Sequence, residues 1–120
     1  YVADWVNDDE PYRLQVKSGS VVALPYTVEL NDIPIHIIQN QGSAGLHDRA
    51  RAAFEVLYEE GRARAKIMCI SMHPYITGAA HRAGFFDKLL EELRRRPGVV
   101  FMRGVDILDT WKTLEAGARR

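Results

Sequence analysis

Two short runs of the chain end in polar side chains that could do chemistry. One apolar run ends at His73-Pro74, and a shorter run near the start ends at Asp4-Trp5. A proline restricts the preceding residue to extended geometry, so His73 is expected to end a strand. Because α/β proteins place their chemistry at the carboxyl ends of parallel strands, the two runs predict one shared site.

His73 is the best single candidate for a catalytic group. A free imidazole titrates near neutral pH and can pass a proton to a leaving group. A histidine that only hydrogen-bonds to backbone at a strand end is an equal alternative on the pattern alone. For Asp4 by itself, a carboxylate that caps a turn is the stronger interpretation.

Further polar residues lie where they could line the same rim. Asp8 and Asp9 form a carboxylate pair in a loop, and Arg82 precedes the helix that follows His73. Such pairs are usually solvated, and an arginine in this position could bind a carboxylate or cover the helix surface. Three more candidates follow the second expected strand: Glu29, Asn31 and Asp32. The chain has no complete metal-ligand spacing, no phosphate-binding glycine loop and no GxSxG elbow.

The order of the elements predicts an α/β fold with parallel strands and outer helices. Helices are expected after Ser43 as N-cap, with a stop at Gly61, and again after Gly78 and after Met102. The arginine run 94–96 is expected to be a solvated helix end. Segment 26–41 is compatible with strand or helix. Four apolar runs predict strands: 2–5, 21–24, 67–72 and 99–102.

Composition narrows the classes of partner. The 120 residues include 16 basic and 16 acidic side chains, which argues against a nucleic-acid or membrane partner. No apolar stretch approaches the roughly 18 residues of a membrane span. No signal peptide is visible, and a cytoplasmic protein is expected. Because the chain starts at Tyr1, almost inside an expected strand, we expect upstream sequence to be missing.

Three stretches, in this order, resemble the later motifs of the polysaccharide deacetylase family. The loop after Asp4-Trp5 is similar to that of the branch containing bacterial allantoinases. The resemblance implies that residues 1–120 are the C-terminal part of a single catalytic domain, a distorted (β/α) barrel. The stretches are Asp4-Trp5-Val6-Asn7-Asp8-Asp9-Glu10-Pro11-Tyr12, Leu24-Pro25-Tyr26 with Glu29, Asn31 and Asp32, and Ile70-Ser71-Met72-His73-Pro74.

The same resemblance implies roles for these residues. His73 would be the general acid, Asp4 would orient the catalytic machinery and Trp5 would line the groove. The reaction would be hydrolysis of a non-peptide amide C–N bond in a small cyclic amide or an N-acetylated sugar. The other residues expected on the substrate side are Asn7, Asp8, Asp9, Glu29, Asn31, Asp32 and Arg82.

The catalytic base and the metal ligands of the family lie upstream of these motifs. No metal ligand is therefore expected in this chain, and the resemblance leaves open whether the complete domain holds a divalent metal such as zinc. The chain alone is expected to be inactive. Open sheet edges and apolar helix faces would favour a homo-oligomer or pairing with the missing N-terminal half. The alternatives are a non-catalytic α/β interaction module and an inactive truncated fragment.

Overall fold

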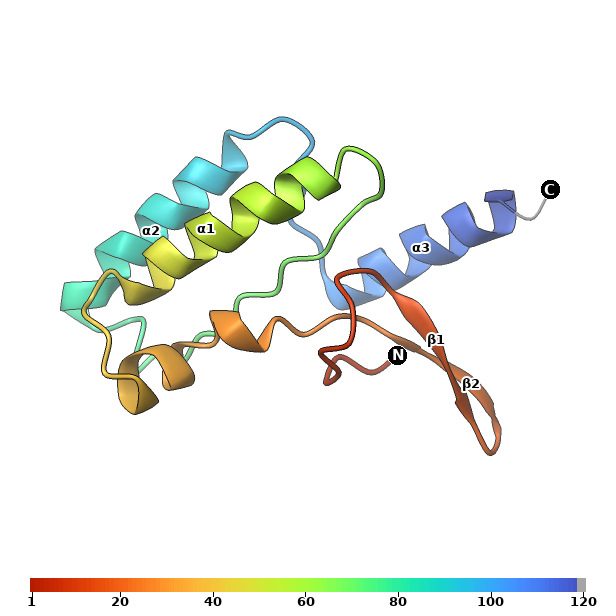
Figure 1. Cartoon of the computed structure of the whole chain (residues 1–120), viewed down its shortest axis with the longest axis horizontal. Coiled ribbons are helices and arrows are strands. Elements are labelled where there is room, and N and C mark those ends of the chain that lie inside the picture. Colours follow the sequence, from red (N-terminus) through yellow and green to blue (C-terminus); the bar gives the residue numbers. More distant parts are fainter. Residues whose placement is uncertain (119–120) are drawn as a thin grey trace.

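The structure is a computed structural model that describes residues 1–118, and it contains three long helices and one hairpin (Figure 1). Short helical turns, η1 and η2, connect the hairpin to the first long helix. The strands are β1 (Tyr12–Val16) and β2 (Gly19–Ala23), and the turns are a 3-10 helix, η1 (Val28–Leu30), and a π-helix, η2 (Ile33–Ile38). The long helices are α1 (Gly45–Glu60), α2 (Ala80–Arg94) and α3 (Gly104–Ala118).

The hairpin is antiparallel, and its register runs from Tyr12 opposite Ala23 to Val16 opposite Gly19. Gly19 has a φ of 131°, a conformation that side chains other than glycine rarely adopt. β2 overlaps the strand expected at 21–24, but its partner β1 was not predicted. The alternation of apolar and polar residues in β1 was a usable signal for a strand.

The strands expected at 2–5, 67–72 and 99–102 are wrong for the described residues. Only single parallel bridges occur, Val2 with Ala23 and Asn31 with Ser71. The amides in 67–72 bond to unrelated groups instead of to one strand: Ile67 to the Asp9 carbonyl, Cys69 to the Thr27 hydroxyl and Ser71 to the Leu30 carbonyl. A ladder requires one continuous partner, so these segments are extended but do not form a parallel sheet.

The helices α1 and α2 pack side by side and bury the main core (Figure 1). Both helices were predicted, and Gly61 is the C-cap of α1, which agrees with the expected stop. Its N-cap is Ala44 and not Ser43, and no side chain caps it. The buried cluster also contacts the extended segment around Met68 and Ile70, so both helices pack against that segment. The buried members are Leu30, Ala50, Phe54, Leu89 and Leu93.

Arg94 and Arg95 are exposed at the end of α2, as expected of a solvated helix end, but Arg96 is not. Its guanidinium binds both carboxylate oxygens of Glu55, each at 2.9 Å, and lies over the rings of Phe54 and Tyr58. A planar guanidinium suits both contacts. Arg96 therefore connects the end of α2 to α1.

The helix α3 lies apart from the α1–α2 pair, beside the hairpin (Figure 1). Arg13 of β1 binds Glu115 of α3 and stacks on Trp111 at 5.2 Å. Large apolar side chains before α3 are exposed, among them Val100 and Phe101. None of the helices in residues 1–118 has the length and apolar character needed to cross a bilayer.

Candidate functional site

His73 lies where the extended segment after Cys69 turns away towards α2. Its side chain is 35% exposed, and its ring meets the edge of Tyr75, with the centroids 5.5 Å apart. One side of the imidazole can therefore reach a ligand while the other side contacts protein. The sequence predicted this exposed position after an extended run.

The buried side of His73 faces Asp32, whose side chain is fully buried. Asp32 Oδ1 lies 2.7 Å from the His73 ring Nδ1, and Asp32 Oδ2 accepts the His73 backbone amide at 2.7 Å. The Thr77 hydroxyl donates to the same Oδ2 at 2.6 Å. The parallel bridge between Asn31 and Ser71 brings the two segments together. We call Asp32 and His73 the dyad.

The hydrogen bonds decide the charge of Asp32. Burial raises the pKa of the carboxyl. The hydrogen bonds from the His73 amide, the Thr77 hydroxyl and the His73 ring together lower it by more, so the net pKa is below its ordinary 3.8. An ionised carboxylate only accepts hydrogen bonds, so the His73 Nδ1 must carry the proton of the ring bond. That leaves Nε2 as the ring atom available for proton transfer.

A tight turn at residues 74–78 fixes the main chain after His73. The His73 carbonyl accepts the amides of Ile76 and Thr77, both at 2.9 Å. A Cβ on Gly78 would lie 2.3 Å from the Pro74 carbonyl oxygen. The turn can therefore close only with glycine at position 78, and its closure places the Thr77 hydroxyl at Asp32.

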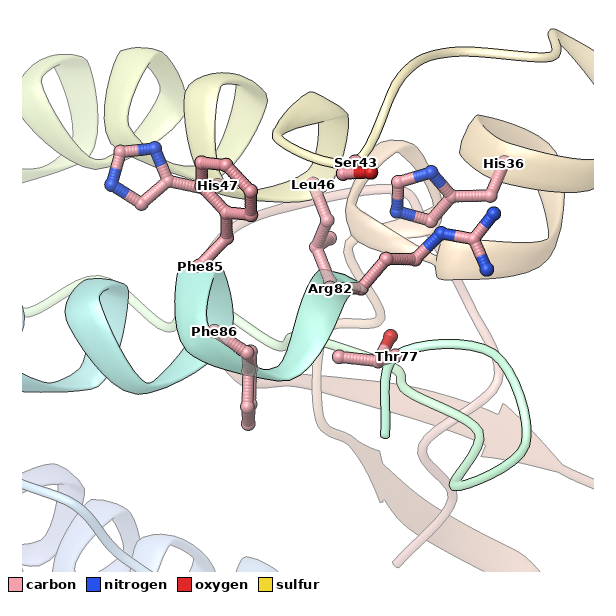
Figure 2. A pocket seen from close by; sticks show the side chains of 8 residues that line it. All are labelled: His36, Ser43, Leu46, His47, Thr77, Arg82, Phe85 and Phe86. Atoms are coloured by element: carbon pink, nitrogen blue, oxygen red, sulfur yellow. The ribbon is translucent and has the colours of Figure 1, made fainter. Parts of the chain in front are cut away.

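A cavity of about 10 Å³ lies behind Thr77, between η2, α1 and α2 (Figure 2). Arg82 reaches into this region, and its Nη1 donates to the Ile76 carbonyl at 3.3 Å. Arg82 therefore supports the turn after His73. Its expected contact with substrate stays a prediction. The side chains that line the cavity are His36, Ser43, Leu46, His47, Thr77, Arg82, Phe85 and Phe86.

Asp4 and Trp5 lie in another exposed segment. The Trp5 carbonyl accepts the Tyr26 amide, and the Tyr26 hydroxyl accepts a hydrogen bond from Asn31 at 2.6 Å. The described residues include no hydrogen bond between the side chain of Asp4 or Trp5 and the dyad. The shared site of Asp4 and His73 stays a prediction, with Tyr26 and Asn31 as the link between their segments.

Of the other expected substrate contacts, Asn7, Asp8 and Asp9 lie in the loop before β1, and Glu29 lies in η1. Asn7 and Glu29 are exposed, whereas Asp9 is half-buried. Asp8 Oδ1 accepts the amides of Asp9 and Glu10 at 2.7 and 3.1 Å, so this carboxylate shapes its own loop. No hydrogen bond or ion pair among the described residues joins these side chains to the dyad, and their role stays a prediction.

Sequence reasoning singled out Asp32, but as a substrate contact and not as the partner of His73. Its buried carboxylate needs hydrogen-bond donors, but that burial comes from the packing of distant segments and not from a local signal in the sequence. Thr77 was not predicted as part of the site. A threonine in a turn carries no signal of its own, because its partner lies 45 positions away.

The described residues also bear on metal binding. Residues 1–118 contain no group of three or more His, Cys, Asp or Glu side chains that could hold a metal ion. The donor set of these described residues does not by itself fit a zinc site.

The comparisons with known proteins agree with the resemblance. No family model matches the chain. A Schizosaccharomyces pombe protein named "Putative polysaccharide deacetylase" is 34% identical over an alignment of 120 positions, which covers 91% of this chain and 38% of that protein. The resemblance to polysaccharide deacetylases is confirmed. It is restricted to their C-terminal part.

Two crystal structures share the fold of this polysaccharide deacetylase-like chain. The first is a "probable Polysaccharide deacetylase" from Pseudomonas aeruginosa PAO1, with 27% identity and a TM-score of 0.81 over 91% of this chain and 37% of that one. The second is Puue allantoinase, with 31% identity and a TM-score of 0.81 over 92% and 38%. The chain spans less than two fifths of the length of these relatives.

Proposed function

We propose that this chain supplies the proton-donating side of a site that hydrolyses a non-peptide amide C–N bond. The single observation that carries the proposal is the dyad, a half-exposed histidine held by a fully buried, ionised aspartate. The chain is similar to proteins named as a deacetylase and an allantoinase, and both names denote hydrolysis of such bonds. The proposal places the chain as the C-terminal part of one (β/α) barrel domain.

In the proposed reaction, His73 protonates the nitrogen that leaves as the C–N bond breaks. The proton comes from Nε2, while Nδ1 keeps its hydrogen bond to Asp32 and the carboxylate stabilises the charged ring. A positioned general acid contributes ~10²–10⁴-fold in rate. Activation of the water is assigned to residues outside this chain.

The proposed substrates are small cyclic amides and N-acetylated sugars. The names of the relatives support both classes and do not separate them. The residues proposed to complete the substrate side are Asp4, Trp5, Asn7, Asp8, Asp9, Glu29, Asn31 and Arg82. The alternative of a non-catalytic module has no comparable support.

The test replaces His73 in the full-length natural protein. His73→Asn keeps an amide donor close to the position of Nδ1 and removes the second ring nitrogen, so Asp32 stays paired while the proton donor is lost. Turnover should fall ~10²–10⁴-fold. Allantoin and an N-acetylated chitooligosaccharide serve as the substrates, and product formation is followed by mass spectrometry.

His81→Asn is the matched control, because His81 is exposed on α2 and no hydrogen bond or ion pair among the described residues joins its side chain to the dyad. This variant should keep the turnover of the unmodified protein. If His73→Asn also keeps full turnover of a hydrolysed substrate, His73 is not the proton donor and the proposed mechanism is wrong.

A further inference from the structure

A third residue, Thr77, is bonded to the dyad and was not predicted from the sequence. The Thr77 side chain is 2% exposed, so it is closed off from substrate. Its hydroxyl nevertheless donates to Asp32 Oδ2 in one of the shortest hydrogen bonds of the site, at 2.6 Å. The Thr77 hydroxyl can therefore fix the orientation of the Asp32 carboxylate and, through it, the orientation of the His73 ring.

The hydrogen bonds of His73, Asp32 and Thr77 form a closed ring. Asp32 accepts the amide of His73 on Oδ2 and its Nδ1 on Oδ1, and the His73 carbonyl accepts the Thr77 amide. The Thr77 hydroxyl then returns to Oδ2. Because Oδ2 receives two donors, the carboxylate cannot rotate without breaking a bond, and Oδ1 stays directed at the imidazole.

We propose that Thr77 is a positioning residue of the proton donor: its hydroxyl holds the Asp32 carboxylate in the orientation that fixes the ring and the tautomer of His73. This inference rests on the proposed role of His73. Thr77 itself is not a catalytic residue, because its side chain is buried and touches no reacting atom.

The wall behind Thr77 supports this role. Figure 2 shows Thr77 and Arg82 lining the same small cavity, and Arg82 donates to the carbonyl of Ile76, the residue before Thr77. Gly78 on the other side of Thr77 permits the close approach of the turn to Pro74. The main chain on both sides of Thr77 is therefore fixed, so its hydroxyl has a defined direction.

The test compares Thr77→Val with Thr77→Ser in the full-length natural protein. Valine has nearly the shape of threonine but lacks the hydroxyl, whereas serine keeps the hydroxyl and lacks the methyl group. The first readout is proton and ¹⁵N NMR of the His73 ring, assigned by the signals lost in His73→Asn. The unmodified protein and Thr77→Ser should show a downfield Nδ1–H proton, and Thr77→Val should lose it by exchange with solvent.

The second readout is the hydrolysis of allantoin, measured well below the melting temperature of each variant. Thr77→Val should lower kcat about ten-fold and leave KM within about two-fold, because Thr77 does not contact substrate. Thr77→Ser should restore kcat. If Thr77→Val does not fold, Thr77→Ala, which avoids a second branched methyl beside the carboxylate, takes its place.

Two results overturn different statements. A folded Thr77→Val protein that keeps both the Nδ1–H signal and the kcat removes Thr77 as a positioning residue, even if His73→Asn is inactive. Full activity in His73→Asn removes the proposed function instead, and the NMR comparison still decides whether Thr77 holds the dyad. A protein that does not hydrolyse allantoin is judged on the NMR readout by itself.

Discussion

Replacing Asp32 with asparagine tests both the stability and the chemistry of the dyad. The carboxylate accepts three hydrogen bonds, from the His73 amide, the His73 ring and the Thr77 hydroxyl. A bond to a charged group contributes about 1.5–3 kcal/mol, and a neutral one about 0.5–1.5 kcal/mol. The loss of charge therefore costs about 1 kcal/mol for each bond, or about 3 kcal/mol for the site.

Asp32→Asn should also change the ring. The asparagine oxygen can take the place of Oδ2, but its NH₂ group then faces Nδ1, which must become an acceptor. The proton moves to Nε2, and the charged ring loses its acceptor. We therefore expect the turnover of the full-length protein to fall even at temperatures where the variant is folded.

The assay for Asp32→Asn is chemical unfolding together with the turnover of the full-length protein. The matched control is Asp106→Asn, because Asp106 forms two hydrogen bonds with Arg103 at the surface, where a pair contributes little. A loss of less than about 1 kcal/mol in Asp32→Asn, with unchanged turnover, would refute the reasoning about the buried carboxylate.

Two further predictions concern acid and the turn. Because the folded pKa of Asp32 lies below 3.8, its contribution to stability is present above that pH and is lost as the pH falls through the folded pKa. The difference in melting temperature between the unmodified protein and Asp32→Asn should therefore shrink below about pH 4, and a constant difference would contradict this. Gly78→Ala should destabilise by about 1–3 kcal/mol in thermal unfolding, because the new Cβ meets the Pro74 carbonyl. Gly84→Ala in α2 is its control, since nothing lies within 4 Å of that position, and it should be neutral or stabilising by up to about 1 kcal/mol. Equal effects of the two alanines would show that the turn can shift freely.

The helices were predictable from the sequence, because the apolar side chains of α1 and α2 recur at the helical period and bury one face. The strands were not, because an apolar run such as 67–72 predicts extended backbone but does not say which partner its amides have. Ile67, Cys69 and Ser71 find three unrelated acceptors. The hairpin strand β1 was missed although its apolar and polar residues alternate, which is a usable signal for a strand.

The candidate site was only partly predictable, because the sequence carries local signals but does not show which distant residues meet. His73 was identified because Pro74 and the preceding apolar run are local signals. Its partner Asp32 was identified as polar and near the site, but its burial depends on the packing of distant segments. Thr77 could not be predicted from the sequence, because only the folded turn brings its hydroxyl to that carboxylate.

The separation of 41 positions between Asp32 and His73 has a consequence for folding. The helix α1 lies between them in the chain, so the bond cannot form until this long crossover has closed and its loop entropy has been overcome. Until then the imidazole has no fixed tautomer, and an incompletely folded molecule carries an ordinary solvent-exposed histidine. The chemical competence of His73 is therefore a late product of folding, acquired when the segments on both sides of α1 meet.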